Sequence, residues 1–204
     1  MSATKCKLCG LMRPADIAAA NALRPDYIGF VFAPKSRRYV SPQLAATLKS
    51  QLAPGIQAVG VFVNEAPETV ADLLNTGTID LAQLHGREGE DYIAHLRTLT
   101  DKAIIQAFKI TAQQDIEQAE QSTADYILLD SGAGSGTTFD WSLLQGIRRP
   151  YFLAGGLAPE NVTQAIRALH PYAVDVSSGI EQNGQKDREK MAAFVAAVRK
   201  EATP

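Results

Sequence analysis

Short apolar runs recur along the whole chain, and charged residues return at helical spacing between them. Eight runs are rich in β-branched and other apolar residues and have the length of buried strands, at residues 5–9, 27–32, 58–63, 81–85, 103–108, 126–130, 151–154 and 173–177. The alanine- and leucine-rich segments between them predict helices over residues 14–23, 41–52, 67–76, 112–121, 159–169 and 187–200. Several of these segments begin with proline, which suits the first turn of a helix.

A strand followed by a helix, repeated through 204 residues, is typical of a closed parallel barrel. The strands are continuously apolar, as expected when both faces of a parallel sheet are covered. We therefore predict a single-domain (βα)8 TIM barrel over residues 1–204, with no domain boundary or linker. The alternative is an open doubly wound sheet, which usually has fewer strands and a ligand loop after its first strand.

Composition and charge narrow the classes of function. The net charge of -2 and the pI near 5.9 give no general attraction to nucleic acid or to an anionic membrane. The amino-terminal residues lack a long apolar stretch, and no run approaches the roughly 18 apolar residues of a membrane span. We expect a cytoplasmic protein with reduced thiols, no nucleic-acid or membrane partner, and a monomer or a homodimer as its assembly.

The loops predicted after the last two strands are rich in glycine and serine. Gly155 and Gly156 precede a helix expected to open at Pro159, and Ser178 and Gly179 follow the next strand in the same way. Glycine lets the backbone approach an anion, and N–H groups at a helix start bind phosphate without lysine. Such loops form the common phosphate site of these barrels, so we predict phosphate binding there, with ordinary tight turns as the alternative.

Asp130 ends the apolar run "YILLD", so its carboxylate is expected either at the barrel mouth or at a helix cap. A partly apolar mouth would raise its pKa toward the range of a useful general acid. The glycine-rich segment at residues 132–138 does not fit a nucleotide-binding motif, because Thr137 breaks the glycine spacing and the Walker lysine is missing. A long loop that closes over a ligand is the better interpretation.

The only two cysteines of the chain, Cys6 and Cys9, have the Cys-x-x-Cys spacing. Side chains alternate along a strand, so Cys6 and Cys9 face opposite sides, and Lys7 lies on the same side as Cys9. A zinc site would need two further ligands and a turn, with only three histidines available, so we predict no metal. Cys9 falls at the mouth, where the Lys7 ammonium is expected to favour the thiolate.

Arg37 and Arg38 follow the second predicted strand in "KSRRYVSP". An arginine at the mouth can bind a carboxylate through two parallel hydrogen bonds, which lysine cannot match. A solvated basic loop is the alternative, and we expect it to apply to one of the two arginines.

Seven motifs in order along the chain resemble those of the phosphoribosylanthranilate isomerase family, which acts in tryptophan biosynthesis. They are "KLCGL", "DYIGFVFAPKSRRYVSP", "VGVFVN", "LAQLHG", "LLDS...GSGTTFDW", "LAGGLAPENV" and "YAVDVSSGIE...KD". The resemblance implies an Amadori rearrangement of N-(5-phosphoribosyl)anthranilate, an aldose–ketose isomerisation that uses no metal or cofactor. The expected partner is this small-molecule substrate.

By the same resemblance, Cys9 is the general base that removes the C2' proton, and Asp130 is the general acid that protonates the furanose ring oxygen. Arg38 would bind the anthranilate carboxylate, and the glycines and serines after the last two strands would bind the phosphate. His85 and Asp175 match family positions and point toward the mouth by alternation. Both are predicted substrate-binding residues together with Lys7, and a supporting role behind the contact residues is the alternative, favoured for His85.

One position departs from the family, because Thr137 replaces the lysine of its "G-[ST]-G-K-T-F-D-W" motif. This casts doubt on any charge contact from that loop. Other phosphosugar barrels remain as alternatives: a thiamin phosphate synthase or a sugar-phosphate epimerase would share the phosphate loops but not Cys9, Asp130 and Arg38 together. A non-catalytic ligand-binding barrel would be expected to have lost Cys9 or Asp130.

Overall fold

The computed structural model describes residues 3–130, 141–144 and 146–201. The predicted closing loop at residues 132–138, including Thr137, lies outside the described residues.

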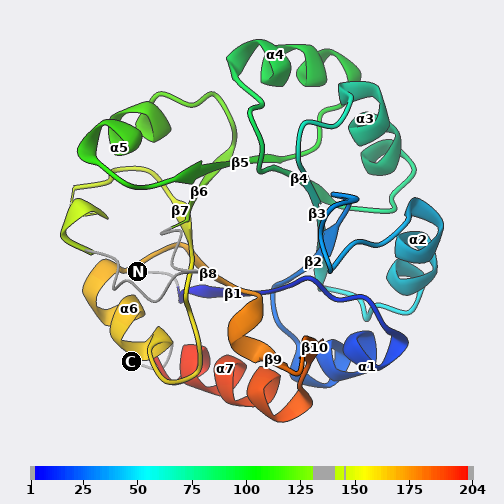
Figure 1. Cartoon of the computed structure of the whole chain (residues 1–204), viewed down its shortest axis with the longest axis vertical. Helices are drawn as coiled ribbons and strands as arrows, with labels where there is room; N and C mark the ends of the chain where they lie inside the picture. Colours follow the sequence, from blue (N-terminus) through cyan, green and yellow to red (C-terminus); the bar gives the residue numbers. More distant parts are fainter. Residues whose placement is uncertain (1–2, 131–140, 145, 202–204) are drawn as a thin grey trace.

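Eight parallel strands pair in sequence order, and β1 closes the barrel by pairing with β8 (Figure 1). This closure confirms the (βα)8 prediction and excludes the open sheet. Each strand lies within one or two residues of its predicted range, because continuous apolar runs bounded by turn residues mark buried parallel strands well. The strands are β1 (Lys5–Cys9), β2 (Tyr27–Val31), β3 (Gln57–Phe62), β4 (Leu81–Leu84), β5 (Ile104–Lys109), β6 (Tyr126–Asp130), β7 (Tyr151–Ala154) and β8 (Ala173–Val176).

Helices form a ring outside the strands (Figure 1). The helices are α1 (Pro14–Leu23), α2 (Pro42–Ser50), α3 (Pro67–Asn75), α4 (Glu90–Leu99), α5 (Gln113–Glu120), α6 (Val162–Leu169) and α7 (Arg188–Lys200), with 3₁₀ turns η1 (Trp141–Leu144) and η2 (Ser178–Ile180). The starts of α1 and α3 at Pro14 and Pro67 and the cap of α2, where Ser41 accepts a hydrogen bond from the Leu44 N–H, agree with the sequence signals.

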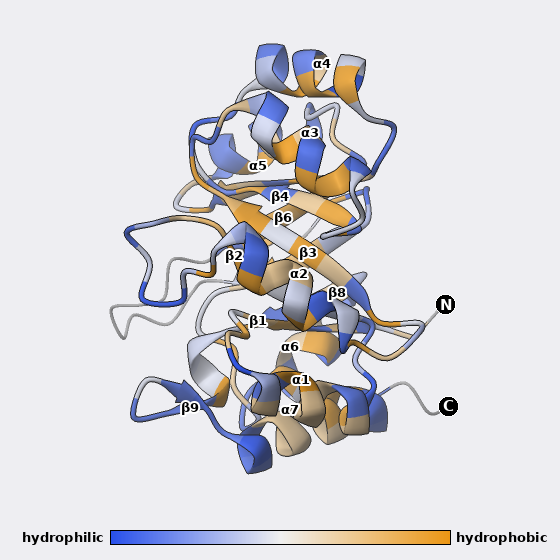
Figure 2. Cartoon of the chain, turned by 90° about the vertical axis from the view of Figure 1, so that its right-hand side faces the viewer, coloured by the Kyte–Doolittle hydropathy of each residue, from blue (hydrophilic) through white to orange (hydrophobic). Residues whose placement is uncertain are grey.

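Three elements differ from the predictions. The helix α4 was not predicted, because it has no proline at its start and buries only Ile93 and Leu96. The helix α6 begins at Val162 rather than at Pro159, which lies in a turn before it. Between β8 and α7 the chain also forms a small hairpin, β9 (Glu181–Gln182) and β10 (Gln185–Lys186), whose polar residues gave no strand signal. In Figure 2 this hairpin is hydrophilic, in contrast to the apolar β3 and β6.

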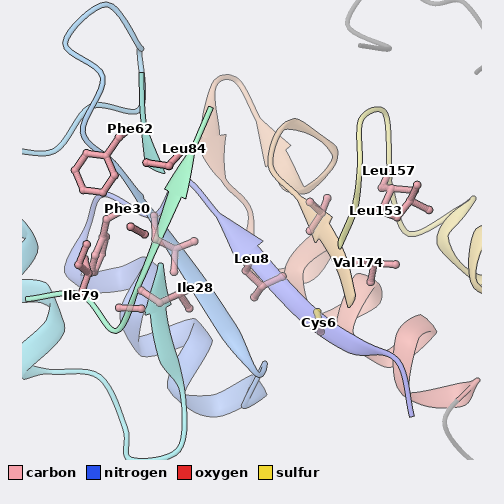
Figure 3. Close-up of a cluster of buried hydrophobic side chains, with 14 of the residues drawn as sticks. Cys6, Leu8, Ile28, Phe30, Phe62, Ile79, Leu84, Leu153, Leu157 and Val174 are labelled. Atoms are coloured by element: carbon pink, nitrogen blue, oxygen red, sulfur yellow. The ribbon is translucent and has the colours of Figure 1, made fainter. Parts of the chain in front are cut away.

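Alternation along β1 divides its side chains between two environments. Cys6 and Leu8 pack in the large apolar cluster between the barrel and its helices (Figure 3), and both are almost fully buried. Lys7 and Cys9 lie outside that cluster and face the barrel interior. The predicted separation of the two cysteines is therefore confirmed, and both thiols are free.

Aromatic side chains close the barrel at the amino ends of its strands. Tyr126 stacks on Tyr172 at a ring separation of 5.1 Å, and Phe152 packs against both rings and against Tyr27. The Lys5 ammonium lies 5.0 Å from the centre of the Tyr172 ring, within the range of a cation–π contact. This end of the barrel is packed, so a ligand has to enter at the opposite end. None of the helices that the structure describes is long and apolar enough to cross a membrane.

Candidate active site

A cavity of about 430 Å³ opens at the carboxyl ends of the strands. Eight of the ten predicted site residues line it: Cys9, Arg38, His85, Asp130, Gly155, Gly156, Asp175 and Ser178. The two exceptions are Lys7, which is fully buried below the cavity, and Gly179, which lies beside it. The barrel therefore gathers residues from β1, β2, β4, β6, β7 and β8 and the loops after them around one space.

Cys9 ends β1 at the wall of the cavity. Its register partner on β2 is Gly29, and a Cβ atom at that position would stand 2.6 Å from the Cys9 sulfur. Only glycine leaves room for the thiol here. Cys9 is 7% exposed, which is enough to line the cavity while most of its surface is packed.

The pKa of the Cys9 thiol is raised, mainly because burial disfavours the charged thiolate. The Lys7 ammonium lowers the pKa, as expected from the sequence, but its effect is smaller, and the Asp175 carboxylate acts in the opposite direction. The expected effect of Lys7, which favours the thiolate, is therefore present, but burial outweighs it.

Lys7 and Asp175 form a buried ion pair under the cavity. They are register partners on β1 and β8, and the Lys7 Nζ donates to Asp175 Oδ2 over 2.7 Å and to Gln83 Oε1 over 2.6 Å. Burial lowers the pKa of Lys7, but the interactions with Asp175 and Cys9 together outweigh it, so the pKa is raised. The other oxygen, Asp175 Oδ1, is buried without a hydrogen-bond partner among the described residues. A buried carboxylate oxygen in that state calls for a donor, and a ligand can supply one.

Asp130 and His85 lie on the other side of the mouth. Asp130 ends β6 as predicted, and its Oδ2 is 3.5 Å from His85 Nε2. His85 follows β4, and its Nδ1 is 2.8 Å from the side-chain nitrogen of Gln83. Gln83 was not predicted as a site residue. Its signal was present, since a glutamine interrupts the apolar run of β4 and points inward with His85 by alternation.

Arg38 is held at the edge of the mouth by a residue that sequence reasoning missed. The Arg38 Nε and one terminal nitrogen donate to the two carboxylate oxygens of Glu181 over 2.6 and 2.8 Å. The Lys186 ammonium also donates to Glu181, over 2.7 Å. These donors outweigh burial and lower the pKa of Glu181 to about 2. The neighbouring Arg37 is exposed, which agrees with a solvated role for one arginine of the pair.

The two predicted phosphate loops contact each other. Gly155 and Gly156 have φ angles of 92° and 63°, the left-handed region that favours glycine. A Cβ atom at Gly179 would stand 2.0 Å from the Leu157 carbonyl oxygen, so the β8 loop can approach the β7 loop only with glycine there. Sequence reasoning missed Asn161, which accepts a hydrogen bond from the Ala158 N–H and donates to the Gly156 carbonyl.

No group of three histidine, cysteine, aspartate or glutamate side chains in the described part of the chain could hold a metal ion. A thiol and a carboxyl group face one cavity from different strands, next to an arginine and two glycine-bearing loops. The closed barrel and this mouth define an acid–base enzyme of the (βα)8 class.

Comparisons with known proteins identify the family. The family model described as N-(5'phosphoribosyl)anthranilate (PRA) isomerase matches residues 6–197. A relative named N-(5'-phosphoribosyl)anthranilate isomerase from Thermoanaerobacter sp. (strain X514) is 43% identical over 202 residues, covering 96% of this chain and 98% of the relative. The relative of the same name from Endomicrobium trichonymphae is 42% identical over 200 residues, with the same coverage. The chain therefore belongs to the N-(5'-phosphoribosyl)anthranilate isomerase family.

Solved structures agree with this assignment. The crystal structure of phosphoribosyl anthranilate isomerase from Thermotoga maritima superposes with a TM-score of 0.89 at 37% identity, covering 97% of this chain and 99% of that one. A phosphoribosyl anthranilate isomerase in complex with reduced 1-(o-carboxyphenylamino)-1-deoxyribulose 5-phosphate superposes with a TM-score of 0.86 at 36% identity, with the same coverage.

Proposed function

We propose that this cavity carries out the Amadori rearrangement of N-(5'-phosphoribosyl)anthranilate, with Cys9 as general base and Asp130 as general acid. The observation that supports this assignment most directly is the placement of the thiol and the carboxyl group. They come from β1 and β6, which are separated by two strands around the barrel, and both line the same cavity. An acid and a base that flank one sugar are what a proton transfer between its oxygen and carbon atoms requires.

The reaction moves one proton in and one proton out. Asp130 donates a proton to the furanose ring oxygen, the C1'–O bond breaks, and the anthranilate nitrogen supplies the electron pair for an iminium ion. This ion acidifies C2', and the Cys9 thiolate removes the C2' proton to give an enolamine, which tautomerises to the ketose. The product is 1-(2-carboxyphenylamino)-1-deoxyribulose 5-phosphate. The raised pKa of Cys9 makes its thiolate a stronger base once it forms.

The remaining residues bind the two ends of the substrate. Arg38 bonds Glu181 through its Nε and one terminal nitrogen, so its other terminal nitrogen is the group proposed to donate to the anthranilate carboxylate. The loops at Gly155, Gly156 and Ser178 are proposed to bind the phosphate through backbone N–H groups, and Gly179 supports them by allowing the two loops to meet.

Asp175 is proposed to accept a hydrogen bond from a substrate hydroxyl or amine through its buried Oδ1. Lys7 is fully buried, so its proposed role is to position Asp175 rather than to contact the substrate. His85 lines the cavity next to Asp130 and is proposed to act on that carboxyl group.

A fluorescence assay tests the proposal. Phosphoribosylanthranilate is made in situ, and its disappearance is followed after addition of the purified protein. We expect turnover in the wild type, a loss of about 10² to 10⁴ in kcat for Cys9→Ser, and near wild-type kcat for Cys6→Ser. Cys6→Ser is the matched control, since the same change is made three residues earlier on β1, on the face that packs against the helices. No turnover in the wild type, or equal losses in both variants, would contradict the proposal.

A further inference from the structure

A continuous row of polar side chains crosses the inside of the barrel below the cavity. The Lys7 ammonium bonds both Asp175 and the Gln83 side-chain oxygen, and the Gln83 nitrogen lies 2.8 Å from His85 Nδ1. His85 Nε2 in turn lies 3.5 Å from Asp130 Oδ2. The row therefore joins the ion pair under Cys9 to the carboxyl group on the opposite side of the mouth. Contacts as long as the last one often shorten between catalytic groups when substrate binds.

The chemistry of Lys7 fixes the orientation of the Gln83 amide. An ammonium group has three donors and no acceptor, so the amide atom that faces it has to be the oxygen. Lys7 is fully buried and Gln83 is 1% exposed, so water does not compete for this contact. The amide nitrogen, which only donates, is consequently the atom directed at His85.

The orientation of Gln83 in turn decides where His85 carries its proton. A nitrogen that receives a hydrogen bond from an amide N–H has to present a lone pair, so Nδ1 is unprotonated. A neutral imidazole then has its proton on Nε2, which is the nitrogen that faces Asp130.

We propose that Gln83 is a positioning residue of this enzyme: held by Lys7, it keeps His85 neutral with the Nε2 proton directed at Asp130. This matters for the proposed acid, because a neutral ring adds no positive charge beside Asp130, whereas an imidazolium would favour the ionised carboxylate, which cannot donate a proton. The functional part of this inference rests on the role proposed for Asp130 above.

Nitrogen-15 NMR of the histidine side chains tests the tautomer without any need for turnover. The chain has three histidines, and the His85 signals are assigned from their loss in His85→Gln. In the wild type near neutral pH we expect a neutral His85 with unprotonated Nδ1 and protonated Nε2. A wild-type His85 with its proton on Nδ1, or a charged ring, would overturn the inference, even if the protein is fully active.

Gln83→Glu is the informative variant. A carboxylate still accepts from Lys7 but cannot donate to His85, so we expect Nδ1 to gain a proton. The kcat should fall by about tenfold or more, a part of the 10² to 10⁴ that a general acid contributes, while KM changes by less than about twofold. Gln83→Met, which removes both contacts, should give a mixture of tautomers and a similar loss of kcat. An unchanged tautomer together with an unchanged kcat in Gln83→Glu would overturn the inference.

Gln106→Glu is the matched control. Gln106 is another buried glutamine of the barrel, on β5, and its side chain bonds the Glu88 carbonyl and Ser122 rather than the cavity residues. We expect Gln106→Glu to leave the His85 tautomer and kcat unchanged, and an equal effect in both variants would show a general structural cost instead. If the wild type has the expected tautomer but no isomerase activity, the proposed function fails and the assignment of the tautomer stands.

Discussion

Arg38 and Glu181 form a two-bond ion pair at the edge of the barrel mouth, with N–O distances of 2.6 and 2.8 Å. The pair joins the loop after β2 to the hairpin after β8, segments far apart in the sequence. It fixes the plane of the guanidinium group that is proposed to meet the substrate carboxylate. An arginine held in this way loses less side-chain entropy when it binds a ligand.

Glu181→Gln should therefore weaken substrate binding more than it slows the chemistry. The glutamine amide is neutral and has one oxygen in place of two, so it cannot replace both hydrogen bonds from Arg38. The Arg38 side chain therefore becomes mobile. We expect KM to rise by about tenfold, equivalent to about 1.4 kcal/mol, with a smaller change in kcat. The control is Glu201→Gln, which breaks the same kind of two-bond pair, with Arg167, away from the mouth. Equal KM values in Glu181→Gln and Glu201→Gln would contradict the role of Glu181.

The same pair predicts a pH dependence of stability. The pKa of Glu181 falls from 4.5 to about 2 on folding, so the pair stabilises the folded state fully above 4.5 and loses this effect as the pH falls toward 2. Urea unfolding of the wild type and Glu181→Gln should show a difference in unfolding free energy at neutral pH that shrinks through this window. A difference that stays constant from neutral pH to about 2 would argue against the ion pair as its source.

Cys9 should titrate above the range of an ordinary thiol. Its pKa is raised from 9.0, so the thiolate is scarce at neutral pH and becomes more abundant as the pH rises. In the Cys6→Ser background, where Cys9 is the single thiol, the rate of alkylation by iodoacetamide should rise with a midpoint above 9.0. The kcat/KM should increase over the same pH range. A midpoint below 9.0 would mean that the charges of Lys7 and Lys186, which both lower the pKa of Cys9, outweigh burial.

Asn161→Ala should loosen the β7 loop. The two hydrogen bonds of Asn161, to Ala158 and Gly156, contribute about 0.5–1.5 kcal/mol each. We expect the inhibition constant of inorganic phosphate to rise by up to about tenfold, with kcat nearly unchanged. The control is Asn21→Ala, because Asn21 makes the same two types of bond, to Ala53 and Gln51, on a helix-to-helix contact outside the mouth. Similar effects in both variants would show that Asn161 has no specific role at the proposed phosphate site.

Gly179→Ala should force the two proposed phosphate loops apart. Its Cβ would meet the Leu157 carbonyl at 2.0 Å, a backbone atom that cannot rotate away. We expect a loss of about 1–3 kcal/mol in the free energy of unfolding and weaker phosphate binding. Gly89→Ala is the control, since its Cβ meets nothing within 4 Å, and its cost should stay below about 1 kcal/mol. Equal stability of Gly179→Ala and the wild type would show that the loops can separate.

The strands and most helices were predictable because their signals are local. A continuous apolar run such as "YILLD" is buried on both faces wherever the chain folds, and Pro14 and Pro67 mark helix starts through their own backbone restraints. The helix α4 was not predicted because its amphipathic pattern is weak, with only Ile93 and Leu96 buried. The alternation of β1 was also sufficient to separate Cys9 from Cys6.

Residues that act through partners distant in sequence were not predictable. Glu181 and Lys186 lie in a polar hairpin with no periodic signal, and their importance comes from Arg38, 143 residues away from Glu181 along the chain. The net shift of the Cys9 pKa depends on a balance between burial and the charges of Lys7 and Asp175. The spacing of residues along the sequence does not predict the direction of that shift.

By itself, the sequence determined the order of the strands, the faces of their side chains and thereby which residues meet at the barrel mouth. These follow from local sterics and from the two-residue period of a strand, which act within a few residues. Only the tertiary structure decided that Lys7 is buried beneath the cavity, that Gln83 joins it to His85, and that Glu181 engages Arg38. Those contacts depend on how the closed barrel brings distant strands within hydrogen-bond distance, and that distance is a property of the fold as a whole.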